Sequence, residues 1–147
     1  MTTAVTIAQT IQLAVAPVFL LAGIGGILAV LATRLGRAVD RSREVARLHP
    51  SSTGDEHDRH VEELRVLDRR ISLANLANTL CAMSALTVCL VIILLFVSQL
   101  ARLDLGSVIA LLFVIAMLLL SGGIIVFLAE IRVAIDSLRV RRDLLER

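Results

Sequence analysis

The chain has 147 residues, of which 57% are hydrophobic and 19% are charged, and its mean hydropathy is +0.86. Charged side chains are absent from residues 1–33, 71–101 and 105–129, and each stretch exceeds the about 20 residues that a helix needs to cross a bilayer. This pattern excludes a water-soluble globule and a disordered chain. We therefore predict an all-α, polytopic membrane protein whose three transmembrane helices extend into a cytoplasmic helical bundle.

The predicted elements form a single membrane domain over residues 1–147. Three transmembrane helices are expected at about 6–33, 71–100 and 107–129. A cytoplasmic helical hairpin fills 34–70, and its two helices are separated by a Pro- and Ser-containing turn at 49–54. A tight turn joins the second and third spans, and a cytoplasmic C-terminal helix covers 130–147.

The distribution of arginine predicts how the chain crosses the membrane. Nine arginines lie in 34–70, one lies in 101–104 and five lie in 130–147. Because basic loops stay in the cytoplasm, we expect a multi-pass protein of the cell (inner) membrane with its N-terminus outside and its C-terminus in the cytoplasm. The chain has no Trp or Tyr, so arginines at the span ends, Arg34 and Arg70 among them, are expected to anchor it at the interfaces.

Several short motifs are familiar when they are taken together. They are Pro17-Val18-Phe19-Leu20-Leu21, Gly23-Ile24-Gly25, Arg34-Leu35 with Arg37, Val39-Asp40-Arg41 with Arg43, and Arg69-Arg70-Ile71 with Asn75. In these motifs the chain resembles a bacterial family, the domain of unknown function 2721, over about residues 7–142. The resemblance implies a three-helix membrane architecture. It implies no activity and no catalytic residue.

A row of small residues marks the first span at spacings of three and four. Such spacing lets helix backbones approach closely. A three-span chain has little interior of its own, so we weigh a contact within the chain against a contact between copies in a homo-oligomer. The residues predicted to form this helix-packing face are Ala22, Gly25, Gly26, Ala29, Ala32 and Gly36.

Two polar groups lie within the apolar spans. One, in the outer half of the first span, includes Gln9 and Gln12, and the other begins the second span. Amides facing lipid are unfavourable, so each group is predicted either to line a water-filled pore or vestibule or to form hydrogen bonds between helices. For the group in the first span, simple exposure at the outer surface is a further alternative. The residues concerned are Thr6, Gln9, Gln12, Ser72, Asn75 and Thr79.

The sequence offers little support for catalysis or active transport. No ionisable residue lies in the middle of a span, whereas ion-coupled transporters commonly carry one there. His57 and His60 have the spacing of a metal-binding pair, but no second group of ligands accompanies them. We expect no enzymatic activity, no catalytic residue, no cofactor and no metal.

The leading hypothesis from the sequence is a homo-oligomeric, passive channel-like assembly in the lipid bilayer. The alternative is a non-conducting membrane scaffold or regulator that recruits a soluble cytoplasmic protein through the 34–70 hairpin. A nucleic acid partner is not expected, because the arginines alternate with acidic residues instead of forming one basic face.

Overall fold

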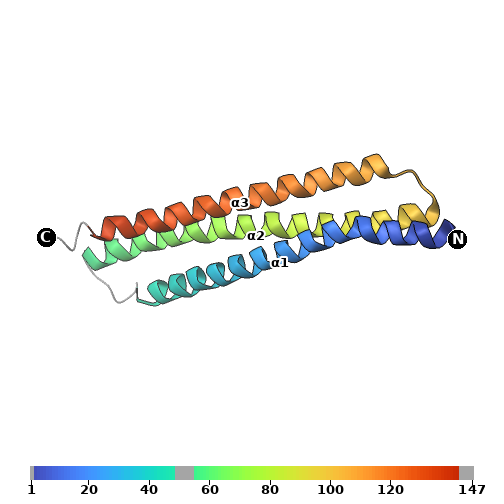
Figure 1. Ribbon diagram of the computed structural model, residues 1–147. Coiled ribbons are helices and arrows are strands. Elements are labelled where there is room, and N and C mark those ends of the chain that lie inside the picture. Colours follow the sequence, from blue (N-terminus) through green and yellow to red (C-terminus); the bar gives the residue numbers. More distant parts are fainter. Residues whose placement is uncertain (1, 49–54, 143–147) are drawn as a thin grey trace. The chain divides into compact units, whose positions relative to one another are not determined.

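The structure is a computed structural model that describes residues 2–48 and 55–142, and every regular element in these ranges is an α-helix. The helices are α1 (Thr2–Leu48), α2 (Asp55–Ala101) and α3 (Gly106–Arg142) (Figure 1). The all-α prediction is therefore confirmed. The turn predicted at 49–54 and the last five residues of the predicted C-terminal helix lie outside the described residues.

Each helix contains a segment long and apolar enough to cross a membrane. These segments are Ile11–Arg47, Leu64–Ala101 and Gly106–Ile135. At 1.5 Å per residue, α1 and α2, with 47 residues each, are about 70 Å long, whereas the hydrocarbon core of a bilayer is about 30 Å thick. The predicted three-span architecture is confirmed, and the helices are longer than the spans themselves.

The chain divides into two compact units, and each helix contributes a segment to both. Unit 1 consists of Met1–Ala29 and Thr79–Gly122, and unit 2 consists of Val30–Asn78 and Gly123–Arg147. Each unit is thus a small packing of three helical segments with an interior of its own.

Buried side chains recur at the spacing that packed helices require. On α1, Leu31, Ala38 and Val45 are buried at intervals of seven residues in unit 2. On α2, Cys81 and Val88 are buried at the same interval in unit 1. Seven-residue repeats keep one seam of a helix against its neighbours, so both units use coiled-coil-like packing.

The middle of α2 turns small residues toward the interior. Ala74, Ala77, Cys81 and Ser84 are all at most 4% exposed. Ser84 is also polar, and its Oγ donates a hydrogen bond of 2.7 Å to the backbone carbonyl of Ala116 on α3. This bond lies within unit 1 and joins α2 to α3 where both are buried.

The α2–α3 connection is the tight turn that the sequence predicts. The N–H of Leu103 donates to the carbonyl of Ser98 at 2.9 Å, and Arg102 has a φ of 52°. This combination is the Schellman motif, in which a left-handed residue ends the helix and the chain folds back onto a carbonyl of its last turn. Glycine usually occupies the left-handed position, so arginine there carries conformational strain.

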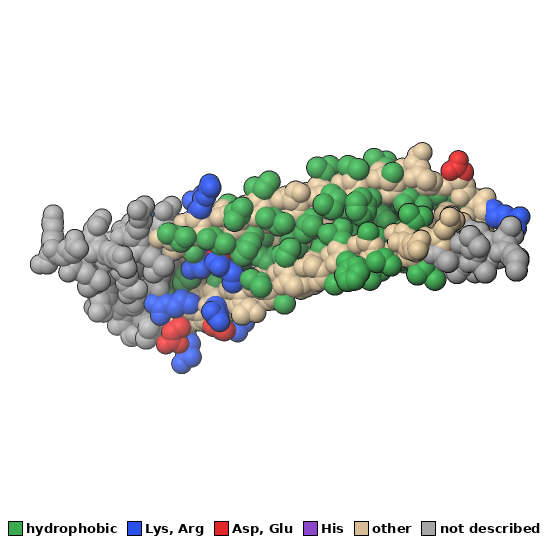
Figure 2. All heavy atoms as spheres, viewed as in Figure 1, with side chains coloured by type: hydrophobic (Ala, Val, Ile, Leu, Met, Phe, Trp, Pro, Cys, Tyr) green, Lys and Arg blue, Asp and Glu red, His purple; other side chains and the backbone are tan. Residues whose placement is uncertain are grey.

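Most of the apolar surface remains outside the packed interiors. In an apolar stretch of 18 residues within each of these segments, between 17% and 22% of the residues are buried, and side chains as large as Phe19 and Leu100 are 74% and 90% exposed. Figure 2 shows hydrophobic side chains over much of the visible surface. Such a surface is stable in lipid and not in water, which supports a multi-pass membrane protein.

Candidate functional site

A buried carboxylate joins the three helices in unit 2. Glu130 of α3 is 2% exposed. Its Oε2 accepts a hydrogen bond of 3.0 Å from a terminal nitrogen of Arg34 on α1. Its Oε1 accepts from Nε of Arg70 on α2 at 3.2 Å, and a terminal nitrogen of the same guanidinium lies equally close. Both oxygens of Glu130 are thus held by cations from the other two helices.

The environment of this ion cluster, formed by Arg34, Arg70 and Glu130, is partly apolar. The guanidinium carbon of Arg34 lies 5.3 Å from the centre of the Phe127 ring, within range of a cation–π interaction. The side chains of Arg34 and Arg70 are 34% and 25% exposed, compared with 3% for Glu130. Burial strengthens a paired charge and penalises an unpaired one, so the cluster favours one mutual arrangement of the three helices within unit 2.

The formal charges of the cluster do not cancel. Two arginines face one carboxylate, which leaves a net charge of +1, and Nε of Arg34 is buried without a hydrogen bond among the described residues. The sequence predicts interface anchoring for Arg34 and Arg70, and the structure shows that both pair with Glu130. The sequence does contain a signal for the cluster, because Arg34, Arg70 and Glu130 each border an uncharged apolar stretch. An acidic residue at the end of one span is a suitable ion-pair partner for basic residues at the corresponding ends of the others.

The small-residue face of α1 points away from the chain's own interior. Its members Ala22, Gly25, Gly26 and Ala29 in unit 1, and Ala32 and Gly36 in unit 2, are all exposed. Apart from the neighbouring backbone of α1, no atom lies within 4 Å of a Cβ placed at any of the three glycines. The interior face of α1 instead carries Ile24 and Leu31, each 1% exposed. The small residues therefore lie on the outer surface of each unit.

The polar residues singled out in the sequence are not gathered into one internal site. Gln9 and Gln12 on α1 and Ser72, Asn75 and Thr79 on α2 are all exposed. Asn75 and Thr79 each have an interaction partner. The side chain of Thr6 lies outside the described ones. The amides of α1 are therefore not hydrogen-bonding groups buried between the helices of this chain.

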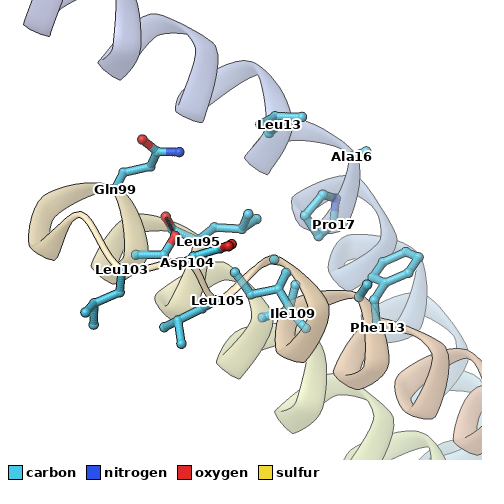
Figure 3. Close-up of a pocket in the computed structure, with 14 residues that line it drawn as sticks. Leu13, Ala16, Pro17, Leu95, Gln99, Leu103, Asp104, Leu105, Ile109 and Phe113 are labelled. Carbon is cyan, nitrogen blue, oxygen red and sulfur yellow. Dashed lines mark hydrogen bonds between the residues drawn. The ribbon is translucent and has the colours of Figure 1, made fainter.

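An open pocket lies in unit 1 beside the α2–α3 turn. Its volume is about 550 Å³, and side chains from all three helices line it. Figure 3 shows its walls and rim, which include Leu13 and Pro17 of α1, Leu95 and Gln99 of α2, Asp104 of the turn and Phe113 of α3. Since Pro17 has no N–H, the carbonyl of Leu13 receives no i+4 hydrogen bond. The hydropathy and charge patterns of the sequence give no sign of this pocket, because it depends on how the helices pack.

Metal-binding and thiol chemistry have little support among the described side chains. No group of three or more His, Cys, Asp or Glu residues that could hold a metal is found among them. The side chains of His57 and His60 lie outside the described set. Cys81 and Cys89 are free thiols, the first buried and the second half-buried.

Comparison with known proteins gives a family and no activity. No curated protein and no solved structure matches the chain. A family model described as "Protein of unknown function (DUF2721)" matches residues 14–140, which include the small-residue face and the ion cluster. The chain therefore belongs to the DUF2721 family.

Proposed function

We propose that the protein forms a homo-oligomeric, passive channel-like assembly in the cell membrane, joined through the small-residue face of α1. The observation that carries this proposal is the exposure of all six residues of that face, with open space around its three glycines. Membrane helices associate through such faces because van der Waals packing and close backbone approach replace the hydrophobic effect. A second copy of α1 carries the same row of small residues, so the two faces can approach each other closely.

The polar residues of α1 supply the conducting element of the proposal. Gln9 and Gln12 are exposed on α1, outside the six-residue face. At about 3.6 residues per turn, Gln12 lies next to Gly26 around the helix, at the edge of that face, and in the proposed assembly the amides of Gln12 and Gln9, one turn apart, surround a common axis. Amides there leave a passage for water and small solutes without a fixed charge. The orientation belongs to the same proposal, with the N-terminus outside and the arginine-rich segments in the cytoplasm.

The contact is tested by Gly26→Leu, with Gly23→Leu as the matched control. Both glycines are exposed on α1 and have open space around them, so neither leucine disturbs the chain's own packing. Gly26→Leu places a large side chain between the proposed copies, where overpacking typically costs about 1–3 kcal/mol. Light scattering in detergent should show a smaller complex for Gly26→Leu only. An unchanged mass for Gly26→Leu would reject this contact.

Conduction is tested in vesicles by Gln12→Glu. In a pore the substitution adds a ring of negative charge, which should favour cations over anions while the oligomer persists. In a packed interface between copies the same acids repel one another, and the assembly weakens. Protein that keeps its oligomer but carries no flux, before or after the change, contradicts the channel.

The alternative is a membrane scaffold or regulator that recruits a soluble cytoplasmic protein, and one observation favours it. Beyond Arg34, α1 continues as an amphipathic helix whose Ala38 and Val45 are buried while Arg37 and Arg43 are exposed. A charged helix face of this kind offers ion pairs to a partner. Reversing both exposed arginines to glutamate should abolish co-purification of that partner without changing ion flux.

A further inference from the structure

The pocket beside the α2–α3 turn combines an apolar wall with a polar rim. Leu13, Leu95 and Phe113 belong to the wall, one from each helix (Figure 3). Gln99 and Asp104 supply polar groups at the rim, and Asp104 is the one charged residue among those that line the pocket. Pockets that bind small molecules have this composition and volumes of about 300–1,000 Å³, and this one measures about 550 Å³.

The position of the pocket along the helices restricts what can fill it. The apolar segment of α2 ends at Ala101 and that of α3 begins at Gly106, so the turn between them lies at a membrane–water interface. The rim is therefore at the level of lipid headgroups, and the wall reaches toward the hydrocarbon. Water is disfavoured against an apolar wall. A molecule with one polar end and one apolar tail satisfies both parts.

The charges of the turn select among such molecules. The carboxylate of Asp104 is exposed and is suited to accept hydrogen bonds from a cationic N–H donor. Arg102, two residues earlier, is exposed and is suited to pair with a phosphate. A primary ammonium and a phosphate are the two charges of an ethanolamine phospholipid. A choline headgroup has no N–H to donate, and a glycerol headgroup has no cation.

We propose that this pocket binds an acyl chain of a phospholipid with a primary-amine headgroup, whose ammonium is held by Asp104. The site lies wholly within unit 1, and its residues do not belong to the small-residue face of α1. The proposal therefore stands or falls independently of the proposed channel.

The test is photolabelling of the full-length protein in vesicles. Phosphatidylethanolamine, phosphatidylcholine and phosphatidylglycerol, each with the same photoreactive acyl chain, are compared at equal mole fraction. Mass spectrometry should find the ethanolamine adducts concentrated on the peptides that contain Leu13 and Phe113. Because an exposed ion pair is worth little, the preference over the other two lipids should be about threefold to fivefold.

Two matched pairs of variants distinguish the contribution of the headgroup contact to labelling from that of the pocket. Asp104→Asn should remove the preference for ethanolamine, while Asp40→Asn, at an exposed aspartate of unit 2, should retain it. Ala110→Phe fills the pocket from α3 and should reduce labelling by all three lipids. Val114→Phe adds the same ring at an exposed position outside the lining and should leave labelling unchanged.

Several outcomes would overturn the proposal. Equal labelling by the three lipids would show that Asp104 does not select the headgroup. Adducts spread evenly over all exposed apolar positions would show that the acyl chain does not bind in the pocket. Disulfide-linked dimers of Ala110→Cys, a pocket position on α3 and not on α1, would show that a second copy occupies it instead. Circular dichroism of each variant verifies that its helices are intact.

Discussion

Replacing Glu130 by glutamine tests whether the ion cluster holds the helices of unit 2 together. The change preserves the shape of the side chain and removes the charge that Arg34 and Arg70 share at 3.0 Å and 3.2 Å. Removing one partner of a buried ion pair costs about 3–5 kcal/mol, because the remaining charge stays buried without compensation. An exposed pair contributes about 0–1 kcal/mol.

The exposure of the arginines places this variant between those limits. Their side chains are 34% and 25% exposed, so water compensates part of the lost charge, and the glutamine oxygen still accepts one hydrogen bond. We expect Glu130→Gln to lower the free energy of unfolding by about 2–3 kcal/mol. The matched control is Glu44→Gln, since Glu44 is 53% exposed and lies 3.8 Å from Arg47. Its loss should be below about 0.5 kcal/mol.

Equilibrium unfolding in mixed micelles, followed by far-ultraviolet circular dichroism, measures both variants on one scale. A third variant sharpens the test: leucine at Arg34, Arg70 and Glu130 together removes the charges without leaving any of them unpaired. Replacement of a buried ion cluster by apolar residues is often neutral or stabilising, so this variant should be at least as stable as Glu130→Gln. Equal losses of unfolding free energy for Glu130→Gln and Glu44→Gln would show that the ion cluster does not hold the helices of unit 2 together.

Three further predictions concern other parts of the chain. Ser84→Ala removes the buried hydrogen bond to α3 and should lower the free energy of unfolding by about 0.6–1.7 kcal/mol in the same assay. Its control is Ser121→Ala, at an exposed serine bonded within its own helix, which should leave the free energy of unfolding almost unchanged. Arg102→Gly relieves the left-handed strain and should raise the unfolding free energy by up to about 1 kcal/mol; a loss there would contradict the strain. A cysteine at Gly106 should react with an impermeant thiol reagent from outside the cell, and labelling from the cytoplasm alone would reverse the orientation.

The spans and the turn could be predicted from the sequence because they depend on composition along the chain. Uncharged stretches of sufficient length predict where helices cross a bilayer, and the polar turn between the second and third stretches marks where α2 ends. The rotation of each helix about its axis could not be predicted in this way. Apolar side chains surround much of every span, so no polar face distinguishes the side against lipid from the side against protein.

That ambiguity explains why the sequence did not predict the ion cluster and why two interpretations of α1 stayed open. Arg34, Arg70 and Glu130 are far apart in sequence, and only the packing of unit 2 shows that they meet. Likewise, the small residues of α1 could equally have faced the chain's interior. In the structure α2 supplies small interior residues such as Ala77, while α1 turns large residues such as Ile24 inward and its small residues outward.

Stability of the single chain and association between copies should therefore depend on different residues. Glu130 is buried and paired with two arginines, whereas Gly26 is exposed and has open space where a side chain would begin. Leucine is also a better helix former than glycine by about 0.8 kcal/mol. Gly26→Leu should thus stabilise the dissociated chain slightly while it weakens the oligomer, and Glu130→Gln should destabilise the chain itself. In the double variant, unfolding free energies measured on dissociated protein should add within about 0.5 kcal/mol. A larger coupling would mean that the small-residue face and the ion cluster share a packing network, and chain stability and association would then not be separable.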